Sequence, residues 1–113
     1  MKINVETKNN AVILHCKGSL DANTVADFKK ETTKLLDGGN VKIIIDGKEL
    51  DFVDSMGLGS LISLLRKTKQ HDGDVLVVNL TSDVRTIFEI TRLHKLFKVF
   101  DDLDQACGEF KKQ

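Results

Sequence analysis

Two short apolar runs, separated by a stretch with helical periodicity, constrain the fold of this chain more than any other feature. Residues 41–46 read Val-Lys-Ile-Ile-Ile-Asp, and residues 75–78 read Val-Leu-Val-Val. Continuous runs rich in isoleucine and valine are typical of strands that are buried on both faces of a parallel sheet. Between them, apolar residues from Met56 to Leu65 recur with the spacing of one helix face. This unit of strand, helix and strand predicts an α/β domain with a mostly parallel sheet.

The N-terminal segment predicts a further strand that runs antiparallel to its neighbour. Residues 3–7 alternate between apolar and polar types, and residues 11–16 form a second apolar run. Asn9 and Asn10 stand between them, and asparagine tolerates the positive φ that tight turns require. We therefore expect a hairpin at the N-terminus, with Gly18 closing its second strand.

The remaining elements follow from periodicity and from the residues that begin and end helices. The expected helices run from Asn23 or Thr24 to residues 38–39, from Asp54 or Ser55 to residues 71–73, from Thr81 or Ser82 to Ile90, and over residues 103–110. A last short strand is expected at residues 98–100, which gives a sheet of four to five strands with helices packed on it. A chain of 113 residues is long enough for one core, so residues 1–113 are interpreted as a single domain.

Composition excludes several classes of function. The 17 basic and 17 acidic residues cancel, so no overall field favours nucleic acid or an anionic membrane. No apolar run approaches the roughly 20 residues that span a bilayer, which argues against membrane insertion and secretion. Cys16 and Cys107 lack the spacing of a zinc or redox motif. Reduced thiols in the cytoplasm are the expected state, with one disulfide as the alternative.

The richest candidate site lies at the start of the second long helix. In an open parallel sheet, ligands bind at the loops that follow the strands, here residues 19–23, 47–55 and 79–83. The second loop ends at Asp54 and Ser55. A phosphoryl group on a serine at a helix start is locally tolerated and adds about −1.5 to −2 charges, which Asp54 would repel. The plainer alternative is that Ser55 is only the helix cap.

The two glycines after this serine have a separate interpretation. Gly57 and Gly59 lack side chains, so the backbone of a partner protein or a nucleotide of a kinase could approach closely.

Catalytic and cofactor motifs are absent from the sequence. The turn 57–60 lacks the third glycine of a dinucleotide fingerprint, and there is no phosphate-loop motif. Ser55 lacks the glycine of a nucleophile elbow, and His15, His71 and His94 do not have metal-site spacing. We therefore expect no metal, no cofactor and no enzymatic activity.

Several segments resemble the STAS domains and, among them, the anti-sigma factor antagonists of the SpoIIAA type. Residues 18–21 (Gly-Ser-Leu-Asp) resemble a turn of that family, residues 44–46 (Ile-Ile-Asp) its central strand, and residues 52–58 (Phe-Val-Asp-Ser-Met-Gly-Leu) its signature loop. Residues 77–79 and 90–93 resemble later stretches. The family commonly has glycine at the position of Arg92. Because of this departure, the sequence does not define where the third helix ends.

The resemblance implies a partner-switching role and a STAS-like fold. The unphosphorylated protein would bind an anti-sigma factor that is a serine/threonine kinase and so release the sigma factor. That kinase would phosphorylate Ser55, and a PP2C-type phosphatase would reverse the reaction. The free protein would be a cytoplasmic monomer without nucleic-acid or membrane partners. The partner-binding residues it implies lie at the signature loop and the preceding turn: Asp21, Ala22, Asn23, Thr24, Asp54, Ser55, Met56, Gly57 and Leu58.

Two other functions stay open at the level of sequence. One is a nucleotide-binding regulatory module that uses the turn 57–60. The other is a constitutive scaffold whose binding does not respond to phosphorylation.

Overall fold

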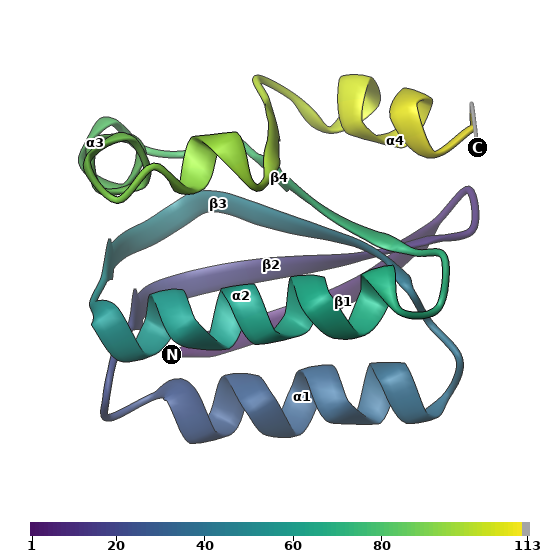
Figure 1. The fold of residues 1–113 in the computed structure, drawn as a ribbon, viewed down its shortest axis with the longest axis horizontal. Coiled ribbons are helices and arrows are strands. Elements are labelled where there is room, and N and C mark those ends of the chain that lie inside the picture. Colours follow the sequence, from purple (N-terminus) through teal and green to yellow (C-terminus); the bar gives the residue numbers. More distant parts are fainter. Residues whose placement is uncertain (112–113) are drawn as a thin grey trace.

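A five-stranded mixed sheet forms the centre of the computed structural model, which describes residues 1–111 (Figure 1). In chain order the strands are β1 (Lys2–Lys8), β2 (Ala11–Leu20), β3 (Lys42–Val53), β4 (Asp74–Val78) and β5 (Lys98–Phe100). They lie side by side in the same order. β1 is antiparallel to β2, and every later pair is parallel. The predicted α/β fold is confirmed, and residues 112–113 of the predicted domain lie outside the described residues.

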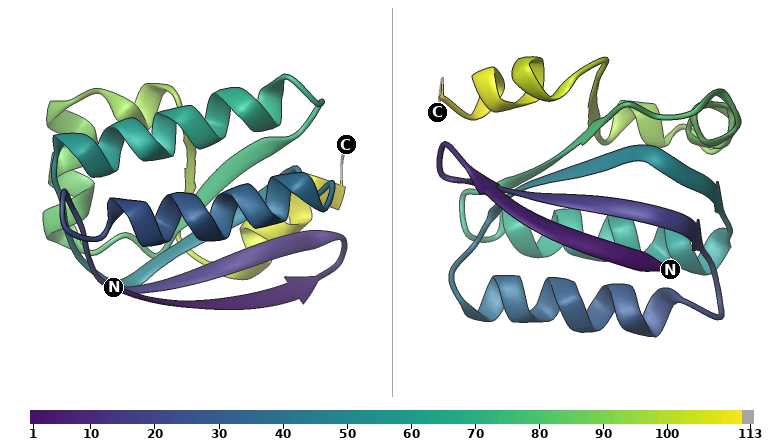
Figure 2. Two further views of the ribbon diagram at one scale, coloured as in Figure 1. Left: turned by 90° about the horizontal axis from the view of Figure 1, so that it is seen from below. Right: turned by 180° about the vertical axis from the view of Figure 1, so that it is seen from behind.

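Helices pack on both faces of this sheet. They are α1 (Val25–Asp37), α2 (Ser55–Lys69), α3 (Ser82–Ile90) and α4 (Leu103–Lys111), with a short 3-10 helix, η1 (Leu93–Lys95), after α3. α1 and α2 run side by side along one face, and α4 lies on the opposite face (Figures 1 and 2). α3 and η1 contribute Val84, Phe88 and Leu93 to the apolar cluster beneath α1 and α2.

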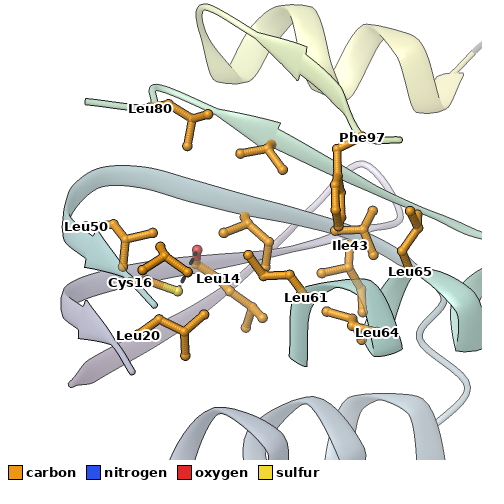
Figure 3. Packing of buried hydrophobic residues seen from close by; sticks show 14 of the residues in the cluster. Leu14, Cys16, Leu20, Ile43, Leu50, Leu61, Leu64, Leu65, Leu80 and Phe97 are labelled. Atoms are coloured by element: carbon orange, nitrogen blue, oxygen red, sulfur yellow. Dashed lines mark hydrogen bonds between the residues drawn. The ribbon is translucent and has the colours of Figure 1, made fainter. Parts of the chain in front are cut away.

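The core is divided between the two faces because residues alternate along each strand. The larger cluster lies beneath α1 and α2 and includes Leu14, Ile43, Ile45, Leu61 and Leu64 (Figure 3). The smaller cluster lies beneath α4 and consists of Ala11, Ile13, Ile44, Leu76, Val78, Ala106, Cys107 and Phe110. β4 and residues 43–47 of β3 are thus buried on both faces, as the apolar runs predicted.

The two cysteines belong to different clusters. Cys16 is part of the larger cluster and Cys107 of the smaller one, on opposite sides of the sheet. Both are buried free thiols, and burial raises the pKa of the Cys16 thiol to about 12. The alternative of a disulfide between them is therefore wrong.

Two strands are longer than the sequence predicted. β2 continues past Gly18 to Leu20, and β3 continues through the expected loop to Val53. The two strands stay paired to Leu20 and Val53, with register shifts between His15 and Lys17 and between Gly18 and Ser19. Gly18 has φ +105°, so it accommodates an irregularity within the strand instead of ending it.

Gly57 sets how closely α2 approaches the end of β2. A Cβ atom added at Gly57 would lie 2.2 Å from the carbonyl oxygen of Leu20 and 2.9 Å from Cγ1 of Val53. The space that the sequence suggested for a partner at this glycine is therefore filled by the chain itself. Gly59 differs, because a Cβ atom there would meet nothing within 4 Å.

Arg92 occupies a backbone conformation that explains why glycine is favoured at this place. Its φ is +62°, in the left-handed region, and it connects the end of α3 at Ile90 to η1. An L-residue is strained there, whereas glycine is not. The departure from the family pattern leaves the end of α3 intact.

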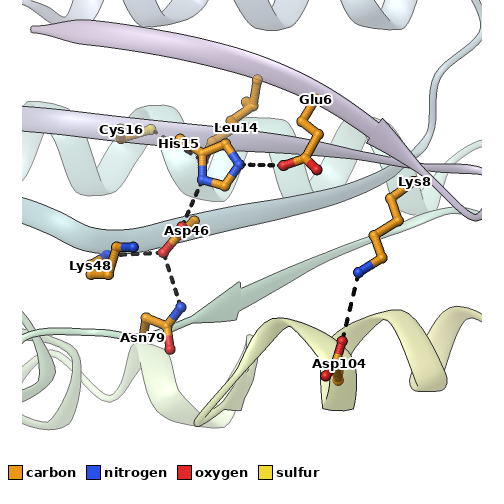
Figure 4. A network of polar contacts seen from close by, with 9 residues as sticks. All are labelled: Glu6, Lys8, Leu14, His15, Cys16, Asp46, Lys48, Asn79 and Asp104. Carbon is orange, nitrogen blue, oxygen red and sulfur yellow. Dashed lines mark hydrogen bonds and ion pairs between the residues drawn. The ribbon is translucent and has the colours of Figure 1, made fainter.

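A polar network lies on the sheet face beside the smaller cluster (Figure 4). His15 of β2 makes two hydrogen bonds of 2.7 Å, from Nδ1 to Asp46 of β3 and from Nε2 to Glu6 of β1. Asp46 is 4% exposed, and its other oxygen accepts from the Lys48 N–H at 3.1 Å and the Asn79 amide at 3.2 Å. An ionised carboxylate only accepts hydrogen bonds, so this arrangement favours a ring that donates from both nitrogens, as an imidazolium does.

The pKa shifts in this network agree with its geometry. Burial lowers the pKa of His15, but the hydrogen bonds to Glu6 and Asp46 outweigh it and raise the pKa above 6.5. Burial likewise raises the pKa of Asp46, but the bonds from Lys48, His15 and Asn79 hold it below 3.8. The sequence analysis excluded only a metal-site spacing for His15 and missed this network, because both carboxylates come from other strands.

Replacing Gly57 with alanine should destabilise the protein, whereas the same change at Gly59 should stabilise it. Gly57→Ala places a Cβ atom against the Leu20 carbonyl, and such overpacking should cost about 2 kcal/mol of unfolding free energy. Gly59→Ala adds a better helix former in open space and should add roughly 0.5–1 kcal/mol. Urea unfolding of both variants measures the difference. A Gly57→Ala variant at least as stable as the wild type would contradict the close contact.

Loss of the His15 proton should make the protein less stable as pH rises. The folded pKa is raised above 6.5, so the stabilisation is complete below that value and is lost as pH increases through the folded pKa. Urea unfolding between about pH 6 and 9 should therefore show a fall in unfolding free energy, and His15→Gln should remove that component. His71→Gln, at an exposed histidine, is the matched control. An NMR titration that gives His15 a pKa below 6.5 would refute the imidazolium.

Candidate functional site

Ser55 is the first residue of α2, and Asp54 is its cap. The Asp54 Oδ1 atom accepts a hydrogen bond of 2.9 Å from the Gly57 N–H. The plainer interpretation of Ser55 as the helix cap is therefore wrong. The Ser55 side chain is exposed, and its hydroxyl makes no hydrogen bond to any residue in the described part of the chain. This serine is available to another molecule at the N-terminus of a helix.

Asp54 also joins the start of α2 to the loop between β2 and α1. Its Oδ2 atom accepts from the Ala22 N–H at 3.0 Å, and its own N–H donates to the Leu20 carbonyl at 3.2 Å. The hydrogen bond from Gly57, together with that from Ala22, holds the pKa of the Asp54 carboxyl below 3.8. A permanent negative charge therefore stands next to Ser55 near neutral pH.

The loop between β2 and α1 is held by its own side chains. The Asp21 carboxylate accepts from the Asn23 N–H at 2.9 Å. The Thr24 hydroxyl donates to the Ser19 carbonyl at 2.8 Å and accepts from the Asp21 N–H at 3.0 Å. Thr24 precedes α1 but gives it no side-chain cap. The loop thus presents Ala22 and Asn23 as exposed residues on a fixed backbone.

The structure brings together the residues predicted from the signature loop and the preceding turn, but it does not expose all of them. Ser55 and Met56 are exposed, the latter by 52%, and Leu58 is half-buried. Gly57 is buried, so it shapes the site by letting α2 approach β2.

Phe52 is a surface residue that the sequence analysis did not assign to the site. It lies near the end of β3 and is 49% exposed, close to Ser55 along the chain. An aromatic residue directly after Asp51, in a segment expected to be a loop, was the available signal in the sequence. It was overlooked because residues 47–53 were interpreted as a loop.

The third predicted loop has a similar helix start. The Thr81 hydroxyl accepts from the Val84 N–H at 3.3 Å and also donates to the Leu50 carbonyl at 3.3 Å. Thr81 thus caps α3, and the exposed Ser82 is its first residue. Ser82 has the same helix position as Ser55 and provides a natural comparison.

The turn 57–60 does not have the geometry of a phosphate loop. It lies within α2, where the Leu58 N–H donates to the Asp54 carbonyl and the Ser60 hydroxyl to the Gly57 carbonyl. A phosphate loop needs free N–H groups around a cavity. The described residues contain no group of His, Cys, Asp and Glu side chains that could hold a metal. None of their helices has the length and apolar character needed to cross a bilayer.

Comparisons with known proteins agree on one family. The model of the STAS domain matches residues 2–106. The anti-sigma-B factor antagonist of Staphylococcus aureus is 28% identical over 101 residues, covering 88% of this chain and 94% of that protein.

Solved structures show the same fold. An anti-sigma factor antagonist from Mycobacterium paratuberculosis has a TM-score of 0.86 at 22% identity and covers 96% of this chain and 92% of its own. The phosphorylated form of SpoIIAA, a Bacillus cell fate determinant, has a TM-score of 0.74 at 20% identity and covers 96% and 97%. The fold, the signature loop and the family match thus agree, and the chain belongs to the STAS domain family.

Proposed function

We propose that this protein is an anti-sigma factor antagonist controlled by phosphorylation of Ser55. Its unphosphorylated form binds an anti-sigma factor that is a serine/threonine kinase, and this binding releases the sigma factor. The observation that carries the proposal is the exposed, unbonded Ser55 hydroxyl at the start of α2, on an edge whose backbone is fixed by Asp54. The names of the Staphylococcus relative and of the Mycobacterium structure support the same role.

Ser55 has the properties of a substrate of another protein's catalysis. Its hydroxyl is accessible, and no base within hydrogen-bond distance activates it in the described residues. The start of a helix carries partial positive charge, so a phosphoryl group there is tolerated within the domain. SpoIIAA, which shares this fold, has been solved in a phosphorylated form. The chain itself would then be a binding protein without catalytic activity.

The same geometry supports phosphorylation as a switch that weakens binding. A phosphoryl group would place about −1.5 to −2 charges beside the ionised Asp54. Met56 and Phe52 supply exposed apolar surface next to this position in the chain. Burying such surface against a partner while desolvating a phosphate is unfavourable. Binding is therefore expected in the unphosphorylated state, through Met56, Leu58 and the exposed residues of the loop 21–24.

The remaining partners follow from this role. A PP2C-type phosphatase would restore the binding-competent form, and the protein would act in the cytoplasm, where sigma factors meet RNA polymerase. Neither nucleic acid nor a membrane is required by this cycle.

Incubation with the cognate kinase and ATP should add a single phosphate, and Ser55→Ala should reduce incorporation to background. Ser82→Ala is the matched control, because Ser82 is exposed and is also the first residue of a helix. Mass spectrometry of the intact protein and its peptides locates the phosphate. Phosphate found on Thr81 or Ser82 would refute the assignment and leave the fold unaffected.

Ser55→Asp should weaken binding to the cognate kinase by about tenfold or more, because 1.4 kcal/mol of repulsion corresponds to tenfold in affinity. Asparagine has nearly the same shape as aspartate but no charge, so Ser55→Asn should bind within about threefold of the wild type. Calorimetry measures both affinities. Equal affinities of the Asp and Asn variants would show that charge is not what controls binding.

A further inference from the structure

A hollow of about 160 Å³ lies between α1 and α2, on the helical face of the domain. These two helices run side by side in both views (Figures 1 and 2). The polar residues of its lining come equally from both helices: Lys29, Thr32, Thr33, Ser60, Ser63 and Lys67. None of them belongs to the edge around Ser55, so ligand binding in this hollow does not depend on the proposed function.

The hollow exists because the side chains between the helices are small and turned toward their own backbones. The buried Ser60 hydroxyl donates to the Gly57 carbonyl at 2.7 Å, and the buried Thr32 hydroxyl donates to the Lys29 carbonyl at 3.2 Å. Short side chains folded back in this way leave space above them. Larger apolar residues at the same places would have closed the gap.

Two further hydroxyls line the hollow and are not used within the protein. Thr33 and Ser63 make no side-chain hydrogen bond within residues 1–111. Thr33 is exposed and Ser63 is half-buried, so both can donate to a molecule that enters the hollow. They come from opposite helices, which places a donor on each side.

Every ionisable group that lines the hollow is a cation. Lys29 and Lys67 have no acidic partner among the described residues, whereas the nearby Lys69 pairs with Asp74 at 3.3 Å. An adjoining hollow along α2 includes Lys67 and adds Arg66. Another adjoining hollow shares Thr33, Leu36 and Lys67 with the first hollow and contains Asp37, the last residue of α1. Since the whole chain has a net charge of zero, this is a local excess of positive charge.

We infer that the hollow between α1 and α2 binds an oxyanion of the phosphate class. Two ammonium groups supply the charge, and two free hydroxyls supply the donors that phosphate oxygens accept. The volume of about 160 Å³ is below the roughly 300 Å³ at which small-molecule pockets begin, so it suits a phosphate or pyrophosphate group. The anion is either free phosphate or the phosphate end of a small metabolite whose remainder lies outside.

Titration with inorganic phosphate, followed by ¹H–¹⁵N correlation spectra at constant ionic strength, tests this site. The expected result is a saturable shift of the Thr33 and Ser63 amides that sodium chloride does not reproduce. The double variant Lys29→Ala with Lys67→Ala should bind phosphate at least about tenfold more weakly. Lys30→Ala with Lys95→Ala removes the same charge from exposed lysines outside the hollow and should bind normally.

Shifts that rise linearly without saturating, or an unchanged affinity of the Lys29 and Lys67 variant, would overturn the inference. So would saturable shifts confined to the first turn of α2, because they would place the anion at the helix N-terminus. Parallel titrations with pyrophosphate, ATP and adenosine identify the source of the anion. Binding of pyrophosphate and ATP with equal affinity supports a free anion, and ATP at least about tenfold tighter than pyrophosphate supports a metabolite.

Discussion

The Asp54 carboxylate is the interaction on which the arrangement of the candidate site depends. One of its oxygens caps α2 and the other holds the Ala22 N–H, so a single side chain fixes two segments that are far apart in sequence. Both bonds favour the ionised form, and they hold the pKa of Asp54 low. The same group therefore determines where Ser55 stands and what electrostatic environment it has. Loss of Asp54 would affect position and charge together.

The sequence was sufficient for features whose causes are local. The buried run 75–78 and the strand and helix alternation identify the sheet, because burial on both faces leaves a continuous apolar pattern. The paired asparagines Asn9 and Asn10 both have positive φ in the hairpin turn, as their side-chain chemistry predicts. The position of Ser55 at a helix start follows from the same kind of local signal.

Features with causes elsewhere in the chain could not be predicted in this way. The second half of β3 is polar where α4 does not cover it, so residues 47–53 resemble a loop although they continue the sheet. The role of Gly57 depends on the Leu20 carbonyl, and the state of His15 depends on carboxylates of two other strands. The hollow between α1 and α2 likewise requires the relative placement of two helices. Each of these is a contact between distant segments.

The close contact between Gly57 and Leu20 limits how a covalent mark on Ser55 can be transmitted. Since a single added carbon at Gly57 would collide with backbone, the first turn of α2 has no room to slide toward β2. Asp54 restrains the same turn from the other direction through Ala22. If Ser55 is phosphorylated as proposed, the backbone should look nearly the same in both states. The partner would then recognise the phosphate directly as a change in surface charge, and the domain would hold it in a fixed position.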